Sequence, residues 1–297
     1  MLSEETGHQP HLISHRVEAR AGNGQLPKLV LMTPNSTAEV YLHGAHVAHF
    51  QRHGERPLLF MSAQSLFAPG KPIRGGVPII FPWFGSRNGA PAHGFVRTAE
   101  WSLVESRATD NATSITLELV QASDSPEWPA HRLHYRVTAG DSLHLELVIM
   151  NTSVTRELTC ENCLHTYFAI GETAHARIAG LQGARYLDKV DRFAEKTEAA
   201  TEIAITGETD RVYLNTPSTV TIIDPTWRRR IIVEKSGSNS TVIWNPWIAK
   251  SKAMADFGDG EYPQMLCVES GNVDRNRLAL APGATVRMLV ELRSEPL

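Results

Sequence analysis

The clearest indication of the fold is the stretch Leu133-His-Tyr-Arg-Val-Thr-Ala-Gly-Asp-Ser-Leu-His-Leu-Glu-Leu-Val-Ile149. Apolar and polar residues alternate over 133–138 and again over 143–149, and a period of two is that of a β-strand with one buried face. The four residues between them, Ala139-Gly-Asp-Ser142, have the composition of a tight turn. The stretch therefore predicts a β-hairpin.

Working outward from this hairpin, the same short alternating segments recur along the chain. They cover 39–42, 114–120, 220–223, 231–234, 241–244, 265–269 and 286–292. Turn residues at 224–226 predict a second hairpin, and the segment 236–240, rich in Gly, Ser and Asn, predicts a third. The more charged and less periodic segment 187–209 is expected to hold loops or short helices. Many short strands with regular turns predict an all-β protein, a β-sandwich or barrel.

Length and composition agree with an ordinary globular protein. The chain has 297 residues, of which 42% are hydrophobic and 21% charged. No low-complexity linker divides it, so we expect one domain over 11–297, with the polar segment 1–10 a candidate for disorder. The net charge of -3 gives no general attraction to nucleic acid or to an anionic membrane. Any anion must therefore be bound by local basic residues.

The sequence also carries signals about compartment. Residues 1–10 have no apolar core of a signal peptide, and no stretch approaches eighteen apolar residues. The three cysteines, an odd and low number, argue against a disulfide framework and fit a reducing compartment. We therefore expect a cytoplasmic protein, and a monomer.

Two residues are candidates for acid–base chemistry. The segment 157–170 predicts a strand on which His165 falls on the more polar face, with Glu161, Cys163 and Tyr167. On this strand alone, an ordinary surface histidine is the simpler interpretation. Glu269 ends a second predicted strand, just before Ser-Gly-Asn, where a carboxylate can line a pocket or simply face solvent.

Three further segments combine glycine or proline with aromatic and polar residues. They are RGGVPIIFPWFG at 74–85, HGFVR at 93–97 and WNPW at 244–247. Glycines let a backbone come close to a ligand, and aromatic rings can stack on the C–H faces of sugars. The segments are therefore candidate ligand loops.

Together with HTYF at 165–168, GLQGARYLDK at 180–189, WNPWIAKSKAMADFG at 244–258 and CVESGNV at 267–273, these segments make the sequence resemble the aldose 1-epimerase (galactose mutarotase-like) superfamily. It is most similar to the glucose-6-phosphate 1-epimerase (hexose-6-phosphate mutarotase) branch. The resemblance implies a large antiparallel β-sandwich, the super-sandwich, with the site on a concave sheet face. It also implies interconversion of the α and β anomers of a hexose 6-phosphate, with no cofactor and no metal.

The resemblance implies a role for each of two proton-handling residues. His165 would be the acid toward the ring oxygen and Glu269 the base on the C1 hydroxyl. The chemistry agrees, because a histidine titrates close to working pH and can donate and recover a proton in each cycle.

The resemblance also implies how the substrate is held. Arg74 and Arg97 would bind the 6-phosphate, for which guanidinium forks are suited, and His93 and Asp210 would contact sugar hydroxyls. Lys71 lies near enough in sequence to add charge. Other interpretations stay open: Arg74 could pack over an aromatic ring, Arg97 could pair with Glu100, and Asp210 could cap a helix. Ala92 stands where the family often has glutamine, which leaves the exact sugar open.

Other patterns favour no function. Cys160 and Cys163 are three apart, so on a strand they point to opposite faces and cannot easily share a metal or a disulfide. The histidines at 43, 46 and 49 and at 131 and 134 have spacings that could suggest a metal, but surface histidines are the simpler prediction. Two alternatives share the loops: an aldose 1-epimerase acting on an unphosphorylated sugar and a non-catalytic carbohydrate-binding sandwich. A polysaccharide-cleaving enzyme would need a second carboxylate across the bond.

Overall fold

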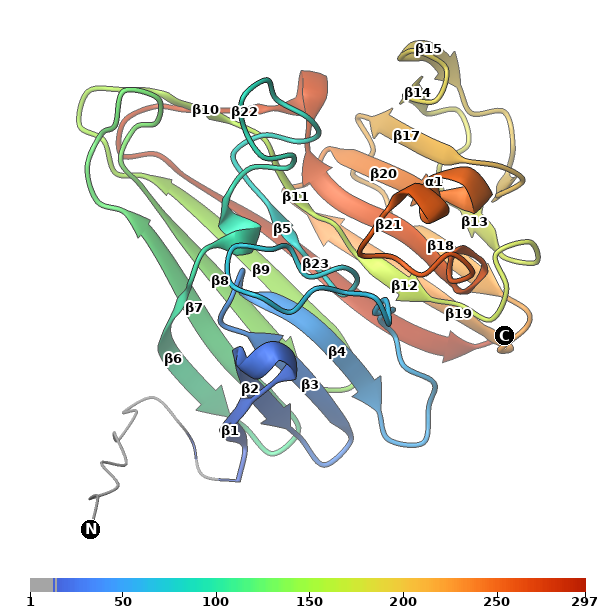
Figure 1. Cartoon of the computed structure of the whole chain (residues 1–297), viewed down its shortest axis with the longest axis horizontal. Coiled ribbons are helices and arrows are strands. Elements are labelled where there is room, and N and C mark those ends of the chain that lie inside the picture. The colour runs from blue at the N-terminus through green and yellow to red at the C-terminus, as the bar shows by residue number, and fades with distance from the viewer. Residues whose placement is uncertain (1–12, 14) are drawn as a thin grey trace.

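The predicted hairpin at 133–149 forms part of one layer of a β-sandwich (Figure 1). The computed structural model describes residue 13 and residues 15–297, so the segment 1–10 lies outside the described residues. One layer is a nine-stranded sheet in the order β16 (Glu202–Ala204), β13 (Arg177–Ala179), β18 (Val220–Asp224), β19 (Arg229–Ser236), β23 (Thr285–Pro296), β9 (Leu143–Asn151), β8 (His131–Ala139), β7 (Thr113–Gln121) and β6 (Ser102–Ala108).

Two smaller sheets pack against it. A four-stranded sheet consists of β1 (Val17–Ala21), β2 (Pro27–Met32), β3 (Ser36–Tyr41) and β4 (His46–Arg52). An eight-stranded sheet has the order β15 (Ala194–Thr197), β14 (Arg185–Asp188), β17 (Thr209–Leu214), β20 (Ser240–Asn245), β21 (Met265–Asn272), β11 (Asn162–Leu164) and β5 (Ile79–Ile80), and β12 (Tyr167–Ala169) also pairs with β21. A separate pair joins β10 (Leu158–Cys160) to β22 (Leu278–Leu280).

Helical structure is short. The α-helix α1 spans Trp247–Ala253, and single 3₁₀ turns cover Asn23–Gln25, Val96–Thr98, Tyr262–Gln264 and Asp274–Asn276. Within the described part of the chain, no helix combines the length and the apolar character that a bilayer crossing needs. The expected all-β antiparallel sandwich is confirmed.

The core lies between the layers and follows the period-two pattern. On β9, Leu143, Leu145, Leu147 and Ile149 are at most 1% exposed, while the residues between them are partly exposed. Their side chains belong to one apolar cluster with residues of both smaller sheets. Burying each such side chain contributes about 1.5–3 kcal/mol, so this alternation is what fixes the strand register.

Two of the three predicted hairpins are confirmed. Strands β8 and β9 pair from Ala139 and Leu143 outward, and β18 pairs with β19 across 225–228. The third prediction was wrong, because β19 pairs with β23 whereas β20 pairs with β17 and β21. The segment 237–239 instead crosses from one layer to the other. Ser238 fastens this crossing by donating its hydroxyl to the carbonyl of Gly271 at 3.0 Å.

The expectation of loops or short helices over 187–209 was right for the loops at 189–193, 198–201 and 205–208 and wrong for the helices. The segment contains β15 and β16 and the beginning of β17 rather than short helices. Several of its charged residues form ion pairs between neighbouring strands and loops, which explains why the alternation was hard to see in the sequence. Lys196 on β15, for example, forms an ion pair with Asp188 at the end of β14 at 2.8 Å.

Strands β20 and β21 have no exposed face. Every residue of both strands is buried. The inner face carries Ile243, Leu266 and Val268 into the main core, whereas the outer face carries Trp244, Cys267 and Glu269. In Figure 1, α1 lies over this outer face. The polar groups of these strands are therefore enclosed between a sheet and the segments that cover it.

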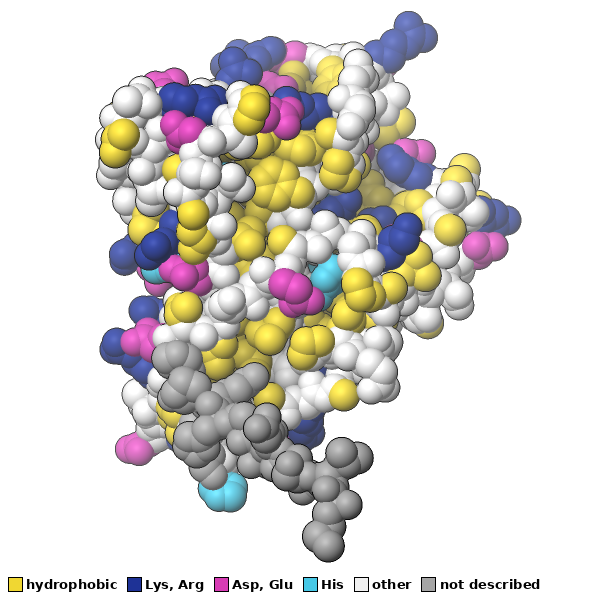
Figure 2. Space-filling view, turned by 60° about the vertical axis from the view of Figure 1, so that its left-hand side comes forward, with side chains coloured by type: hydrophobic (Ala, Val, Ile, Leu, Met, Phe, Trp, Pro, Cys, Tyr) yellow, Lys and Arg dark blue, Asp and Glu magenta, His cyan; other side chains and the backbone are white. Residues whose placement is uncertain are grey.

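Charges on the surface are mixed in sign. On the face in Figure 2, Lys and Arg side chains lie beside Asp and Glu side chains, and apolar atoms occupy the recesses between them. This distribution agrees with the small net charge of the sequence. On this face, no broad field of one sign is available to attract a polyanion.

Candidate active site

A cavity of about 600 Å³ opens on the outer face of the eight-stranded sheet. This size is within the range of small-molecule sites. All six residues that were predicted to act on a substrate line the cavity: Arg74, His93, Arg97, His165, Asp210 and Glu269. They come from segments spread over nearly 200 residues of the chain, so the fold has brought them together.

His165 lies in a break between two strands. The predicted strand over 157–170 is divided, because β11 ends at Leu164 and β12 begins at Tyr167. At the break, the backbone N–H of His165 donates to the carbonyl of Pro78 at 3.0 Å. The residue is 7% exposed, so the surface interpretation is wrong. Its imidazole instead stacks on the ring of Tyr167, with centroids 4.8 Å apart and planes 11° from parallel.

Glu269 lies in the middle of β21, opposite Val242 of β20, and not at the end of a strand as predicted. The glycine two residues later had indicated a turn. Gly271 is part of the strand, however, and a Cβ there would lie 2.4 Å from the carbonyl oxygen of Asn162. The glycine therefore permits a close approach between β21 and β11 rather than a turn.

The two groups face each other. The Nε2 atom of His165 is 3.3 Å from Oε1 of Glu269, and the Glu269 side chain is 1% exposed. His165 Nδ1 and Glu269 Oε1 are buried atoms without a hydrogen-bond partner in the structure. Buried polar atoms are rarely left unpaired, so a ligand that supplies the missing partners fits here.

Burial drives both groups toward their uncharged forms. Desolvation raises the pKa of Glu269 well above its usual range, and the nearby Asp210 carboxylate adds to this, while Lys189 opposes it. Desolvation lowers the pKa of His165 well below its usual range, helped by His93, Arg74 and Arg97. Within the protein alone, burial therefore shifts the pair in the direction of a neutral imidazole and a protonated carboxyl.

One end of the cavity is positively charged. Arg74 donates to Oδ2 of Asp256 at 3.1 and 3.2 Å and to the hydroxyl of Tyr167 at 2.9 Å. Arg97 donates to the carbonyl of Ala92 at 2.7 Å, so it does not use Glu100 as its partner there. Burial, with a further contribution from Arg74, lowers the pKa of Arg97 to about 10, which leaves it charged at neutral pH.

His93 and Asp210 line the same cavity. The His93 ring is 5.6 Å from that of His165, and burial together with the surrounding cations lowers its pKa to about 3. Asp210 is on β17 and therefore caps no helix; its carboxylate is 3.1 Å from Nζ of Lys189. An imidazole nitrogen and the oxygens of a carboxyl group can both accept hydrogen bonds from hydroxyl groups.

Sequence reasoning missed several residues of the site. Lys189, Lys250 and Phe84 line the cavity, and Asp256 binds Arg74 beside it. Lys189 and Asp256 fall in segments that carried the family resemblance, but nothing in the sequence tied either of them to a partner. Lys71, by contrast, has an exposed side chain outside the cavity lining.

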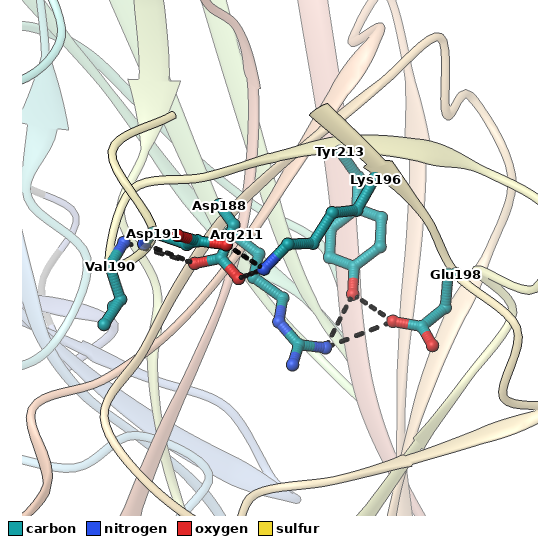
Figure 3. Close-up of polar contacts among 7 residues, drawn as sticks. All are labelled: Asp188, Val190, Asp191, Lys196, Glu198, Arg211 and Tyr213. Carbon is teal, nitrogen blue, oxygen red and sulfur yellow. Dashed lines mark hydrogen bonds and ion pairs between the residues drawn. The ribbon is translucent and has the colours of Figure 1, made fainter. Parts of the chain in front are cut away.

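A network of polar contacts holds the loop that carries Lys189 (Figure 3). Lys196 on β15 bridges Asp188 at 2.8 Å and Asp191 at 2.7 Å. Behind it, Glu198 accepts a hydrogen bond from Tyr213 at 2.7 Å and pairs with Arg211 at 3.2 Å. These contacts join β14, β15 and β17 beside the cavity and fix the chain on both sides of the loop.

The candidate ligand loops serve in different ways. Gly85 lines the cavity and has open space where a Cβ would be. Gly76 and Gly94 instead allow close contact within the protein, because a Cβ would lie 2.3 Å from the carbonyl oxygen of Val47 and 1.8 Å from that of Phe81, respectively. The cavity is lined by Trp244, an aromatic ring available to a sugar.

The residues that could hold a metal ion include the proposed acid and base themselves. Among the described residues, His165, Cys267 and Glu269 have donor atoms within 4.8 Å of one another. Metal ligands must be deprotonated. Burial raises the pKa of the Cys267 thiol well above its usual range, as it does for Glu269. The environment of Cys267 and Glu269 therefore favours their protonated forms, which suit proton transfer better than metal binding.

Some of the histidines that were expected at the surface are buried. His43 and His46 are each 1% exposed, and so is His131, so the surface prediction was wrong for these three. His43 uses Nε2 to contact the carbonyl of Lys71 at 2.8 Å, which is a structural contact. Burial lowers the pKa of His46 to about 3.

The comparisons with known proteins agree with the geometry. The family described as aldose 1-epimerase matches residues 27–293. A "Putative glucose-6-phosphate 1-epimerase" of Cenchrus ciliaris is 36% identical over 282 residues, which are 91% of this chain and 85% of that protein. A protein of the same name from Salmonella typhimurium is 35% identical and covers 82% of this chain and 83% of its own length. Among solved structures, a "putative mutarotase" from Salmonella typhimurium superposes with a TM-score of 0.87 at 30% identity, covering 97% of this chain and 96% of that one.

Proposed function

The chain belongs to the aldose 1-epimerase family, and from this premise and the cavity's geometry we propose that it interconverts the α and β anomers of a hexose 6-phosphate. Glucose 6-phosphate is the expected substrate, because relatives at 33–36% identity carry the name "Putative glucose-6-phosphate 1-epimerase". The observation that carries the proposal is the 3.3 Å approach of His165 Nε2 to Glu269 Oε1 in a cavity that two arginines also line.

The reaction needs one acid and one base that reach the same carbon. Glu269, as a carboxylate, takes the proton of the C1 hydroxyl, and the electron pair of that O–H bond forms the C1 carbonyl. The bond between C1 and the ring oxygen breaks, and the ring oxygen takes a proton from His165. Rotation about C1–C2 turns the other carbonyl face toward the ring oxygen, and the reverse steps close the ring. The ring oxygen and the C1 hydroxyl share one carbon, which is why the acid and the base must be close neighbours.

The proton count of the pair suits this cycle. A neutral His165 beside a protonated Glu269 holds as many protons as a charged imidazolium beside a carboxylate. One proton moving across the 3.3 Å gap therefore converts the resting pair into an acid and a base. No proton has to be taken from or released to solvent during a turnover.

The substrate's phosphate would assist this conversion. Arg74 and Arg97 help to hold the His165 pKa low. A phosphate dianion bound by these arginines offsets their charge, so the imidazolium becomes easier to form when substrate is present. Binding the non-reacting end of the sugar thus prepares the acid at the reacting end.

A second candidate substrate is an unphosphorylated aldose. The observation that favours it is that Arg74 already has a carboxylate partner, Asp256, at 3.1 Å. A phosphate must therefore share or displace Asp256, whereas a neutral sugar would not disturb the pair. Rates with glucose and with glucose 6-phosphate, measured on the same preparation, separate the two substrates.

The proposal is tested by adding the purified protein to a pure α-anomer and following mutarotation by polarimetry. We expect acceleration above the spontaneous rate, and a larger kcat/KM for the 6-phosphate than for the free sugar. A protein that binds the sugar without accelerating its mutarotation would support the carbohydrate-binding alternative and refute the proposal.

A further inference from the structure

A buried thiol contacts the carboxylate of Glu269 on the side away from His165. Sγ of Cys163 is 3.5 Å from Oε2 of Glu269, in hydrogen-bonding geometry. Cys163 is on β11, which pairs with β21, and it is fully buried. The other oxygen, Oε1, has no hydrogen-bond partner and lies 3.3 Å from Nε2 of His165. The two carboxylate oxygens are therefore held in different surroundings.

We propose that Cys163 is a positioning residue for Glu269: its thiol donates a hydrogen bond to Oε2 and leaves Oε1 free to face His165 and the C1 hydroxyl of a sugar. The inference rests on the proposed function. Cys163 itself takes no part in the proton transfers, because the carboxylate lies between it and the position of the substrate.

The choice of a thiol has a chemical consequence. A thiol is a weak hydrogen-bond donor, so it fixes one oxygen while stabilising the carboxylate only slightly. A strong donor at this place would favour the ionised form and make Glu269 a poorer base. Burial raises the pKa of the Cys163 thiol well above its usual range, so the thiol keeps the hydrogen that it donates.

Other ionisable groups surround the pair on every side. Those that act on Glu269 or Cys163 from the neighbouring elements are Glu161, His165, Lys189, Asp210, Lys235 and Cys267. Of these, Lys235 on β19 lies on the Cys163 side, where Nζ donates to the carbonyl of Ser240 and to the hydroxyl of Thr241, each at 2.7 Å. None of these groups is altered by a substitution at 163, so a change in pH dependence there reports on the thiol itself.

The test compares the pH dependence of kcat/KM in Cys163→Ser and Cys163→Ala. A serine hydroxyl is a stronger donor, so it should favour the ionised Glu269 and move the pH optimum downward. Alanine removes the donor, so it should move the optimum upward. We expect shifts of about one pH unit in opposite directions, because a hydrogen bond to a charged group in a buried site is worth about that much. Cys160→Ala is the matched control, since Cys160 is also buried but packs in the main core, and its optimum should stay in place.

A merely structural role would lower the melting temperature or kcat without moving the optimum. An optimum that stays in place in both variants, or moves in the same direction in both, would overturn the inference. Failure of the proposed function would look different, because the wild-type protein would then show no mutarotation.

The hydrogen bond between Cys163 and Glu269 can also be detected by a spectroscopic measurement that does not depend on enzyme activity. The infrared S–H stretching band of Cys163, assigned by its absence in Cys163→Ala, should move in Glu269→Ala toward the position of a thiol without an acceptor. A band that does not move would show that the hydrogen bond is absent and would equally overturn the inference.

Discussion

Tyr167 stacks on the imidazole of His165, and its hydroxyl accepts a hydrogen bond from Arg74 at 2.9 Å. One side chain thus joins the proposed acid to the proposed phosphate end of the cavity. Its ring is fully buried and also meets the edge of Trp244, so it has little freedom to move. The distance between the two ends of the site is therefore set by a rigid aromatic spacer.

Removing the hydroxyl of this spacer should weaken binding more than chemistry. Tyr167→Phe keeps the stack on His165 but deprives Arg74 of one partner. A hydrogen bond to a charged group contributes about 1.5–3 kcal/mol, so KM for the hexose 6-phosphate should rise roughly tenfold to a hundredfold while kcat changes little. Steady-state kinetics measures this. A large fall in kcat at constant KM would show instead that the hydroxyl acts in the proton transfers.

Arg97 should discriminate between phosphorylated and free sugars. It has a single hydrogen bond in the structure, to the carbonyl of Ala92, and its remaining donors are available to an anion. Arg97→Ala should lower kcat/KM for glucose 6-phosphate on the order of a hundredfold and leave that for glucose nearly unchanged. The matched control is Arg87→Ala, an arginine over the rings of Trp83 and Trp128, which does not line the cavity. Equal losses on both sugars in Arg97→Ala would refute a phosphate role.

The buried carboxyl of Glu269 should cost the ligand-free protein stability. Desolvation is the main cause that raises the pKa of this carboxyl in the folded protein. As the pH increases past the ordinary glutamate range, the carboxyl therefore ionises more readily in the unfolded chain than in the folded protein. Wild-type stability should therefore fall relative to Glu269→Gln above about pH 4.3, and the difference should vanish below that value. Because the pKa is raised in the folded protein, Glu269→Gln should be more stable than wild type at pH 7. Urea unfolding of wild type and Glu269→Gln at pH 4 and at pH 7 measures the difference in the free energy of unfolding at each pH. A Glu269→Gln variant that is less stable than wild type at pH 7 would contradict the argument.

Binding of an anion should make His165 easier to protonate. The arginines contribute to its lowered pKa, so a phosphate bound beside them should raise it. We expect the nitrogen NMR signals of His165 to titrate at higher pH in the presence of a hexitol 6-phosphate, which cannot form a ring. The same addition to Arg97→Ala should produce a smaller shift. An unchanged or lowered His165 pKa in the wild-type complex would contradict the electrostatic coupling.

The strands could be predicted from the sequence because apolar and polar residues alternate along each strand that has one buried face. Both strands of the 133–149 hairpin are clear for this reason. The partner of a strand is less evident: the residues at 237–239 suit a hairpin and a crossing between layers equally well. Gly271 likewise indicated a turn, although it makes room for β11, which lies more than 100 residues earlier in the chain.

The residues of the candidate site could be named from the sequence, but their surroundings could not. His165 and Glu269 were identified from the family resemblance, whereas their burial depends on segments distant in sequence that cover the sheet. The ion pairs of Lys189 with Asp210 and of Arg74 with Asp256 were not foreseen. The second of these joins residues 182 positions apart, and no local pattern encodes such a contact.

The most direct test is the rate at which α- and β-glucose 6-phosphate exchange at equilibrium, measured by NMR exchange spectroscopy with wild type, His165→Ala and Glu269→Gln. We expect rapid exchange with wild type and, with either folded variant, exchange near the spontaneous rate. Near-normal exchange with either variant would remove that side chain from the reaction and contradict the account of an acid and a base 3.3 Å apart acting on one sugar carbon.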